Sequence, residues 1–399
     1  MERRQFLNSV AGLSLGKMIR AGGRERIIII GGGIVGASIC YRLAQRGVAV
    51  TLLERQEPAA GATRGSFAWI NASFTKQPRH YFNLNLQGIL AFRALHQELG
   101  RALPVVWSGT VEWYSTSDRA AELRRMVGVQ QEWGYPIRLL ERGALERLEP
   151  RVRFQPGCSA SLATIEGHVD AAGATRLLLE KARMFGAEIV YPCDVRKIEA
   201  DRSGYLLRTS RGEMLAEKLV LACGTETSRM AEMAGIDIPL IPAPGIVVKT
   251  APQPRTFSHL LVTEEAHMRR GLDGRVVIGD DFGPPATAVH RLLEGEQRTF
   301  PSRALARIHG ERIRAQAARS LPEIGRARIE EVNLCWRPMP KDGFPVVGYA
   351  DGQRRLYLAV MHSGVTLGPL IGSLATMEIV DGVTVDLLAP YRPLRFGVH

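Results

Sequence analysis

Hydrophobic and polar positions follow different periods along this chain, and the periods predict a mixed α/β protein. Residues 27–30 are four consecutive isoleucines, which is typical of a strand buried on both faces of a parallel sheet. Apolar residues recur at helical spacing over 80–99 and, most strongly, over 170–186, so both segments are predicted to be helices. The run 356–360 predicts another buried strand, and a long helical stretch rich in Ala, Leu and Ile follows it.

In the middle of the chain the pattern predicts shorter segments, both strands and helices. From 238 to 278, short Val/Ile runs punctuated by proline predict antiparallel strands, and 303–320 has the spacing of a helix. The segment 105–114 is strand-like and aromatic, and 120–133 is helical. Three further strands are predicted over 188–191, 205–209 and 214–221.

A glycine motif stands where the first strand turns into a helix. Gly31, Gly33 and Gly36 have G-x-G-x-x-G spacing, which permits a tight turn, close approach of backbone N–H groups to a pyrophosphate, and close packing of helix on strand. The strand 49–53 then ends at Glu54, the place of a carboxylate that binds a ribose hydroxyl. We therefore expect dinucleotide binding by Glu54 and by the turn, including Ile34 and Val35.

Two further segments extend this site. After Glu54 comes Arg55 and then a run of small residues whose backbone amides could reach a second part of the ligand, namely Gly61, Ala62, Thr63, Gly65 and Ser66. Near the C-terminus, the strand 356–360 leads into a His-Ser-Gly turn and a helix. The two ends of the chain thus have the pattern of one nucleotide-binding domain.

At this point the sequence resembles the FAD-dependent D-amino-acid oxidase superfamily, in particular its glycine-oxidase and sarcosine-oxidase branch. The resemblance spans about residues 25–385 and is carried by several motifs in the family's order, at 167–170, 218–224, 273–279 and 337–348. It implies FAD as the cofactor. It also implies a Rossmann-type, glutathione-reductase-like FAD-binding domain interleaved with an α+β substrate domain built on an antiparallel sheet.

The domain ranges follow from the motifs and the pattern together. We expect the FAD-binding domain to consist of 25–100, 150–230 and 335–399, and the substrate domain of 101–149 and 231–334. The resemblance also implies a larger set of cofactor-binding residues in the later segments: Val195, Cys223, Gly224, Arg337, His362, Ser363, Gly364, Val365, Thr366 and Leu367.

The resemblance implies oxidation of the C–N bond of a small amino acid or secondary amine, with a hydride passing to flavin N5 and O2 as acceptor. Two alternatives remain open: a dehydrogenase that passes electrons to a quinone or another carrier, and a non-catalytic FAD-binding scaffold subunit. The protein's own tasks would be to clamp the substrate and to exclude water.

Three side chains are candidates for catalysis. Arg337 matches the arginine of the family's R-P motif, and its planar guanidinium suits a substrate carboxylate, although a structural arginine is the alternative. His267 precedes the 273–275 turn, where the family contributes to the substrate face, and a structural histidine is again the alternative. His362 opens a turn whose amides would face the flavin N1–C2=O edge.

Composition and charge limit the kinds of partner and ligand that we expect for this protein. The net charge is +12, but only seven of the 52 basic residues are lysines and the arginines are scattered, so nucleic acid is not an expected partner. No apolar run reaches the ~18 residues of a membrane span. Five cysteines without metal-ligand spacing predict no metal site. Cys335 lies near the place where the sarcosine-oxidase branch attaches flavin covalently, and a small packing residue is the alternative.

The first 24 residues are set apart from the fold. Glu2-Arg3-Arg4-Gln5-Phe6-Leu7 resembles a twin-arginine export signal, which would place the protein in the periplasm. The alternative is a basic N-terminal arm on a cytoplasmic protein. The pattern also leaves a homo-oligomer open.

Overall fold

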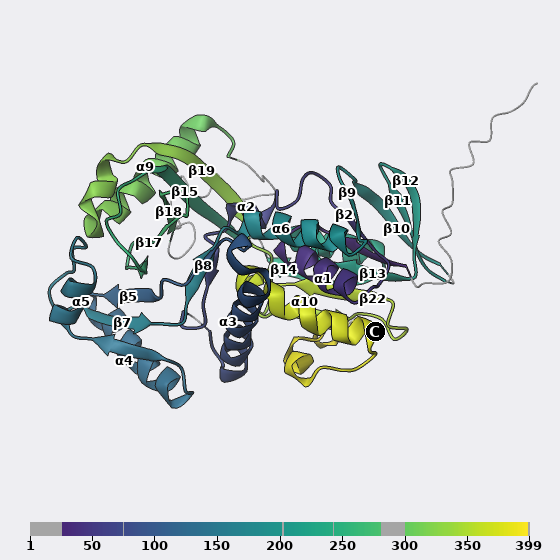
Figure 1. Cartoon of the computed structure of the whole chain (residues 1–399), viewed down its shortest axis with the longest axis horizontal. Coiled ribbons are helices and arrows are strands. Elements are labelled where there is room, and N and C mark those ends of the chain that lie inside the picture. Colours follow the sequence, from purple (N-terminus) through teal and green to yellow (C-terminus); the bar gives the residue numbers. More distant parts are fainter. Residues whose placement is uncertain (1–25, 75, 202, 242, 281–299, 398–399) are drawn as a thin grey trace, which may run out of the picture.

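Two large sheets organise the computed structural model, which describes residues 26–74, 76–201, 203–241, 243–280 and 300–397 (Figure 1). The predicted N-terminal signal or arm lies outside the described residues, so the localisation that depends on it stays a prediction. None of the helices in these described ranges combines the length and hydropathy needed to cross a bilayer.

The first sheet has six strands. All neighbours pair in parallel except β21 and β22, which are antiparallel. In order across the sheet the strands are β21 (Val346–Tyr349), β22 (Leu356–Val360), β13 (Lys218–Leu221), β1 (Ile27–Ile30), β2 (Val50–Leu53) and β9 (Glu188–Val190).

Both faces of this sheet are covered, as the isoleucine run predicts. Ile27 and Ile29 belong to the core under the helices, whereas Ile28 and Ile30 belong to the core on the opposite face. The helices are α1 (Ile34–Gln45), α3 (Arg79–Leu99), α6 (Ala171–Met184) and α10 (Gly364–Val380). The opposite layer consists of β10 (Val195–Asp201), β11 (Gly204–Thr209), β12 (Gly212–Ala216) and α7 (Thr227–Met233).

The second sheet has eight strands and lies at the other end of the molecule (Figure 1). Its pairing is antiparallel except between β16 and β5. In order the strands are β19 (Ile329–Trp336), β15 (Pro244–Pro252), β18 (Arg275–Asp280), β17 (Ala266–Arg270), β16 (Leu260–Val262), β5 (Thr110–Tyr114), β7 (Ser159–Ala163) and β6 (Ile137–Leu140). Its helices are α4 (Ser117–Glu132), α5 (Arg142–Leu148) and α9 (Arg303–Ser320).

Short elements connect the two sheets. A three-stranded sheet and a two-stranded ladder lie between them: β3 (Trp69–Ile70), β8 (Gly167–Val169) and β4 (Val105–Val106), and β14 (Leu240–Ile241) with β20 (Met339–Pro340). The helix α2 (Ala62–Gly65) belongs to the same region. The 3₁₀ helices are η1 (Gly100–Ala102), η2 (Gly224–Glu226), η3 (Pro322–Arg326), η4 (Asp386–Tyr391) and η5 (Pro393–Phe396).

The predicted fold class is confirmed, with two differences in detail. The segment 105–114 forms two strands because Gly109 takes a φ of +70° and breaks the extended run. Strand β7 pairs with β5 and β6 in the eight-stranded sheet, although its residues fall in the range predicted for the FAD-binding domain. The proposed domain division itself stays a prediction.

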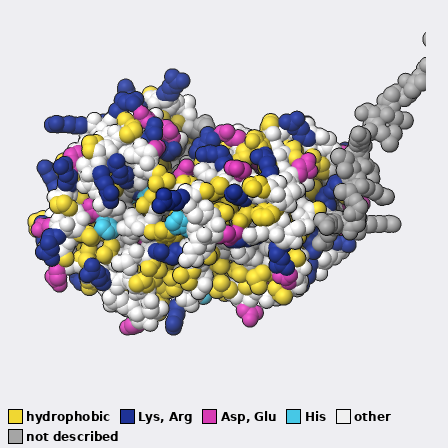
Figure 2. All heavy atoms as spheres, in the orientation of Figure 1, with side chains coloured by type: hydrophobic (Ala, Val, Ile, Leu, Met, Phe, Trp, Pro, Cys, Tyr) yellow, Lys and Arg dark blue, Asp and Glu magenta, His cyan; other side chains and the backbone are white. Residues whose placement is uncertain are grey.

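The basic surface has no single stripe on the face drawn in Figure 2. Lysine and arginine side chains are spread over it and stand next to acidic ones. The described residues include many ion pairs, such as Arg275 with Glu330 at 2.8 Å and Arg46 with Asp381 at 2.7 Å. Positive and negative side chains are thus interspersed on this face.

Candidate functional site

The turn between β1 and α1 accepts only glycine at two of its positions. Gly31 has a φ of +113°, and a Cβ atom there would lie 2.3 Å from the Ala222 carbonyl oxygen. A Cβ on Gly36 would lie 2.0 Å from the Gly31 carbonyl oxygen. The helix therefore starts directly against the strand, and its N-terminus forms a positive end suited to a pyrophosphate.

The predicted ribose carboxylate lies at the end of β2. Glu54 accepts a hydrogen bond from the Gly32 amide and another from the Gln56 amide, both at 2.8 Å. Arg55 pairs with Glu226 at 3.6 Å. Val195 is buried at the start of β10. The backbone amides thus hold Glu54 beside the glycine turn, as a ribose-binding carboxylate requires.

The β13 strand ends on the other side of the same turn. Cys223 donates its S–H to the Ile30 carbonyl at 3.1 Å, and burial raises its pKa to about 12. Gly224 follows with a φ of +59°. Both residues therefore stand at the carboxyl edge of the sheet, where open α/β folds bind ligands.

The small-residue segment packs between the two sheets. Thr63 accepts a hydrogen bond from the Ile34 amide at 3.1 Å, which ties α2 to the start of α1. Gly65 lies so close to β19 that a Cβ on it would be 2.4 Å from the Cys335 Cβ. The Cys335 thiol donates to the Gly65 carbonyl at 3.0 Å, and burial raises its pKa to about 11. This geometry favours a packing role for Cys335, and covalent flavin attachment stays untested.

The N-terminus of α10 lies next to that of α1. A Cβ on Gly364 would be 3.2 Å from Val35 Cγ2. Ser363 is the N-cap, and its hydroxyl accepts a hydrogen bond from Lys76 Nζ and bonds Tyr81 Oη, each at 2.8 Å. In the first turn, the Thr366 hydroxyl donates to the Trp69 carbonyl at 3.1 Å. The segment from His362 to Leu367 is therefore brought to the glycine turn, 330 residues away in sequence.

His362 lies among positive charges. It keeps exposed surface, but the surrounding protein desolvates its ring, and the charges of Lys76 and Arg337 oppose protonation. Together these effects lower the pKa of His362 to about 3. The imidazole is therefore neutral at physiological pH. Folding brings the nitrogen-bearing side chains of Lys76, Arg337 and His362 into one region from distant segments of the chain.

Arg337 directly follows β19 and is half-buried. Its Nε donates to the Ala243 carbonyl at 3.3 Å, and its Nη2 to the Pro244 carbonyl at 3.0 Å. Desolvation lowers the pKa of Arg337, but a guanidinium remains charged at neutral pH. Within the described residues Nη1 makes no hydrogen bond, so the group is oriented and still has a donor to offer.

His267 is buried on β17 inside an aromatic cluster. The ring centroids of Phe67, Trp69 and Phe74 lie 5.8, 5.7 and 5.3 Å from that of His267. Next to it, the buried Arg269 donates to the Phe67 carbonyl, and desolvation lowers its pKa to about 10. Aromatic rings thus surround the imidazole, and a direct role of His267 toward substrate stays a prediction.

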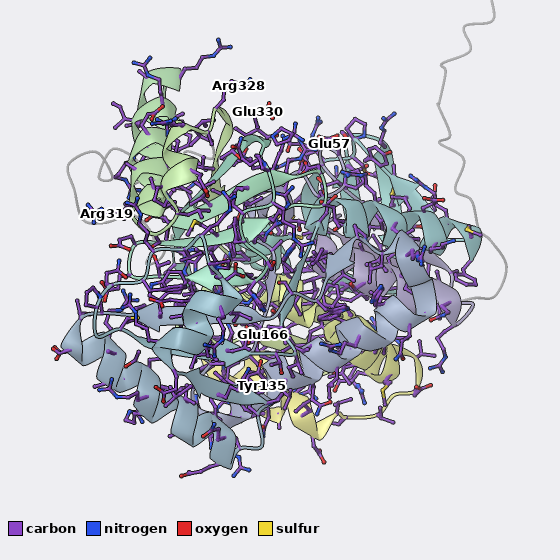
Figure 3. The ribbon with its side chains drawn as sticks, turned by 60° about the vertical axis from the view of Figure 1, so that its left-hand side comes forward. Glu57, Tyr135, Glu166, Arg319, Arg328 and Glu330 are labelled. Atoms are coloured by element: carbon purple, nitrogen blue, oxygen red, sulfur yellow. The ribbon has the colours of Figure 1, made fainter. Side chains whose placement is uncertain are left out.

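Two residues near the site were not among the predicted ones. Glu166 is fully buried and accepts four hydrogen bonds, from Trp69 Nε1 (3.1 Å), the Ala72 amide (2.9 Å), the Ser73 amide (2.8 Å) and Tyr135 Oη (2.7 Å); Figure 3 shows it beside Tyr135. Lys76 is the other residue. Lysine is rare in this arginine-rich chain, but its rarity does not distinguish Lys76 from the other lysines. No signal in the sequence distinguishes Glu166.

The residues present fit FAD. Glu54 ends β2, the glycine turn ends β1, and Ser363 follows β22, so the three lie in order across the sheet at its carboxyl edge. A dinucleotide with its ribose at Glu54 and its pyrophosphate at the turn would extend its other end toward α10. In the described part of the chain no three His, Cys, Asp or Glu side chains gather in a way that could hold a metal ion.

Comparison with known proteins agrees with this arrangement. Glycine oxidase of Geobacillus kaustophilus is 27% identical, over 93% of this chain and 97% of that protein. Rat mitochondrial dimethylglycine dehydrogenase is 25% identical over 94% of this chain, which spans only 45% of that protein's length. The crystal structure of glycine oxidase from Geobacillus kaustophilus superimposes with a TM-score of 0.82 at 24% identity, covering 93% of this chain and 99% of that one, which shows the shared fold.

The family model for FAD dependent oxidoreductases, DAO, matches residues 26–377, which is most of the chain. The match covers the glycine turn, the α2 segment, Arg337 and most of α10. On this evidence the chain is an FAD-binding enzyme that belongs to the family of FAD-dependent oxidoreductases.

Proposed function

We propose that this enzyme oxidises the C–N bond of a small amino acid or secondary amine, by oxidative deamination or N-dealkylation. The observation that carries the proposal is the oriented guanidinium of Arg337, whose charge acts on the neutral imidazole of His362 at the end of the site that would receive the flavin. When bound, FAD supplies the chemistry, because it accepts a hydride from the substrate carbon.

The protein's residues supply binding and orientation. Arg337 is held by two carbonyls, so it can offer its remaining donor and its charge to a substrate carboxylate with little loss of conformational entropy. The neutral His362 ring adds no positive charge of its own that would repel a substrate amine. The aromatic cluster around His267 excludes water on the remaining side.

We further propose O2 as the electron acceptor, as the name of the glycine oxidase relative suggests for that protein. The second candidate is a dehydrogenase that passes electrons to another carrier, and the dimethylglycine dehydrogenase relative supports it. Stoichiometric hydrogen peroxide during aerobic turnover would support the oxidase. Turnover that requires a quinone or dye and yields no peroxide would favour the dehydrogenase.

The substrate class is tested by anaerobic mixing while the flavin absorbance is followed. The panel is glycine, sarcosine, dimethylglycine, D-alanine, D-proline and an N-carboxymethyl amine, with acetate as a carboxylate that carries no amine. Bleaching by one of the amines and none by acetate is the expected result. FAD that stays oxidised with every amine would contradict the proposal and favour the scaffold subunit.

A further inference from the structure

Lys76 is a buried cation that the proposed reaction has not yet used. The residue is only 6% exposed, and its ammonium makes one hydrogen bond, to Ser363 Oγ at 2.8 Å. It also lies 5.4 Å from the centre of the Tyr81 ring. No carboxylate of the described residues pairs with it. Because an uncompensated buried charge costs several kcal/mol, this arrangement calls for an anionic group beyond the described residues.

The loop that carries Lys76 is held firmly. Glu166 binds the Ala72 and Ser73 amides, the Asn71 amide donates to Thr366 Oγ1 at 3.2 Å, and Gln130 Nε2 donates to the Ser73 carbonyl at 2.6 Å. Three separate segments of the chain therefore position residues 71–73, shortly before the lysine. Such preorganisation is typical of a functional site, because the cost of ordering is met on folding.

The position of the ammonium indicates which anion it meets. Ser363 caps the N-terminus of the 17-residue helix α10, and that end carries the positive pole of the helix dipole. Arg337, the candidate for the substrate carboxylate, is held instead by Ala243 and Pro244 at the start of the substrate-domain strand β15. Lys76 thus lies on the cofactor side of the site, at the end where the flavin ring is expected.

We propose that the Lys76 ammonium faces the N1–C2=O edge of bound FAD and stabilises the negative charge that this edge carries in the reduced cofactor. In the hydride transfer, the C–H bond of the substrate carbon breaks, and two electrons and one proton arrive at flavin N5. One negative charge is then left at N1–C2=O. The nearby ammonium and the helix pole favour that product electrostatically.

The test compares the wild type with Lys76→Met by two measurements that do not depend on turnover. One is the dissociation constant of sulfite, which adds at flavin N5 and leaves the same negative charge at N1–C2=O. The other is the midpoint potential of bound FAD, measured against a reference dye. Loss of the ammonium should raise the sulfite constant at least tenfold and lower the two-electron midpoint by about 30 mV, the equivalent of that factor.

Matched variants isolate the charge. Lys76→Arg keeps the positive charge, so its sulfite dissociation constant and its midpoint potential should both stay close to those of the wild type. Lys341→Met removes an exposed lysine after β20 and should change neither. If Lys76→Met does not hold FAD, Lys76→Gln takes its place in the comparison. Glutamine is also neutral, but it keeps a donor toward Ser363. If neither neutral variant holds FAD while Lys76→Arg does, the charge acts in cofactor binding and the proposal is overturned.

Two other results would overturn it as well. Unchanged sulfite affinity and potential in FAD-loaded Lys76→Met would place the ammonium away from the ring edge. Weaker perturbation of the flavin spectrum by acetate, with unchanged sulfite affinity, would assign Lys76 to the substrate carboxylate. The inference rests on FAD binding, and failure of every amine to reduce the wild type would refute the proposed function while leaving the sulfite and potential results standing.

Discussion

At the scale of single residues, the guanidinium of Arg337 leads to a sharp prediction. Arg337→Lys keeps the charge but loses the fork that reaches two backbone carbonyls and that, as we propose, also binds the substrate carboxylate. Carboxylate-bearing substrates should bind more weakly by about 1.5–3 kcal/mol, the range for one charge-assisted hydrogen bond. The measurement is the substrate Kd from anaerobic flavin titration, with FAD content determined in parallel.

Arg151→Lys serves as the control, because that side chain is 62% exposed and pairs with Glu323 on the surface. If Arg337→Lys loses FAD together with stability, the arginine is structural. If substrate affinity is unaltered, the clamp lies elsewhere. Arg269 and Arg270 then become the next candidates, although each already donates to backbone carbonyls.

At the scale of elements, the buried carboxylate of Glu166 is one of the groups that hold the loop between β3 and α3. Glu166→Gln leaves one carbonyl oxygen where two carboxylate oxygens accept four donors, and turns an NH2 group toward donors. The free energy of unfolding should fall by about 1.5–3 kcal/mol or more, as expected when a buried charge-assisted bond is lost. Urea unfolding checks this value.

Tyr135→Phe tests one of the four hydrogen bonds to Glu166 by itself. Burial, first, and the neighbouring Glu166 raise the pKa of Tyr135 well above its ordinary value, so its hydroxyl is a permanent donor. Removing it deletes one of the four bonds and should cost about 1 kcal/mol. Equal stability of Glu166→Gln and the wild type would show that the loop is held by its other contacts.

At the scale of the whole molecule, acid stability depends on a contact that joins the C-terminus to the first sheet. Glu378 on α10 is buried and accepts hydrogen bonds from Arg392 Nη1, the Val385 amide and Tyr357 Oη, each at 2.8 Å. Burial alone would raise the pKa of Glu378, but the bonds from Arg392, Val385 and Tyr357 and the charge of Arg392 hold it below its ordinary value.

A depressed pKa in the folded state fixes the sign of the pH dependence. The stabilisation is complete above the unfolded value of about 4.3 and is lost as the pH falls through the lower, folded value. The difference in unfolding free energy between wild type and Glu378→Gln should therefore be large at pH 7 and shrink below about pH 4.3. Urea unfolding from pH 7 to pH 3 measures it, and parallel curves would exclude the mechanism.

Much of the fold follows from local pattern. The isoleucine run, the glycine spacing and the acid at position 54 predicted β1, α1 and β2, because each depends on neighbours only a few residues away. The helices over 80–99, 170–186 and 303–320 were predicted nearly to their ends for the same reason, as α3, α6 and α9 show. Family motifs added FAD and the late residues Arg337 and His362.

The tertiary structure decided what depends on long-range contacts. Strand β7 joined the eight-stranded sheet through pairing with β5 and β6, which no local period specifies. The fit of Gly65 against Cys335 and the four bonds to Glu166 join residues from about 30 to 270 positions apart. Lys76 has no distinctive pattern around it. Its importance arises only because folding buries its charge against Ser363 without a carboxylate partner in the described residues, and burial is a property of the packed molecule.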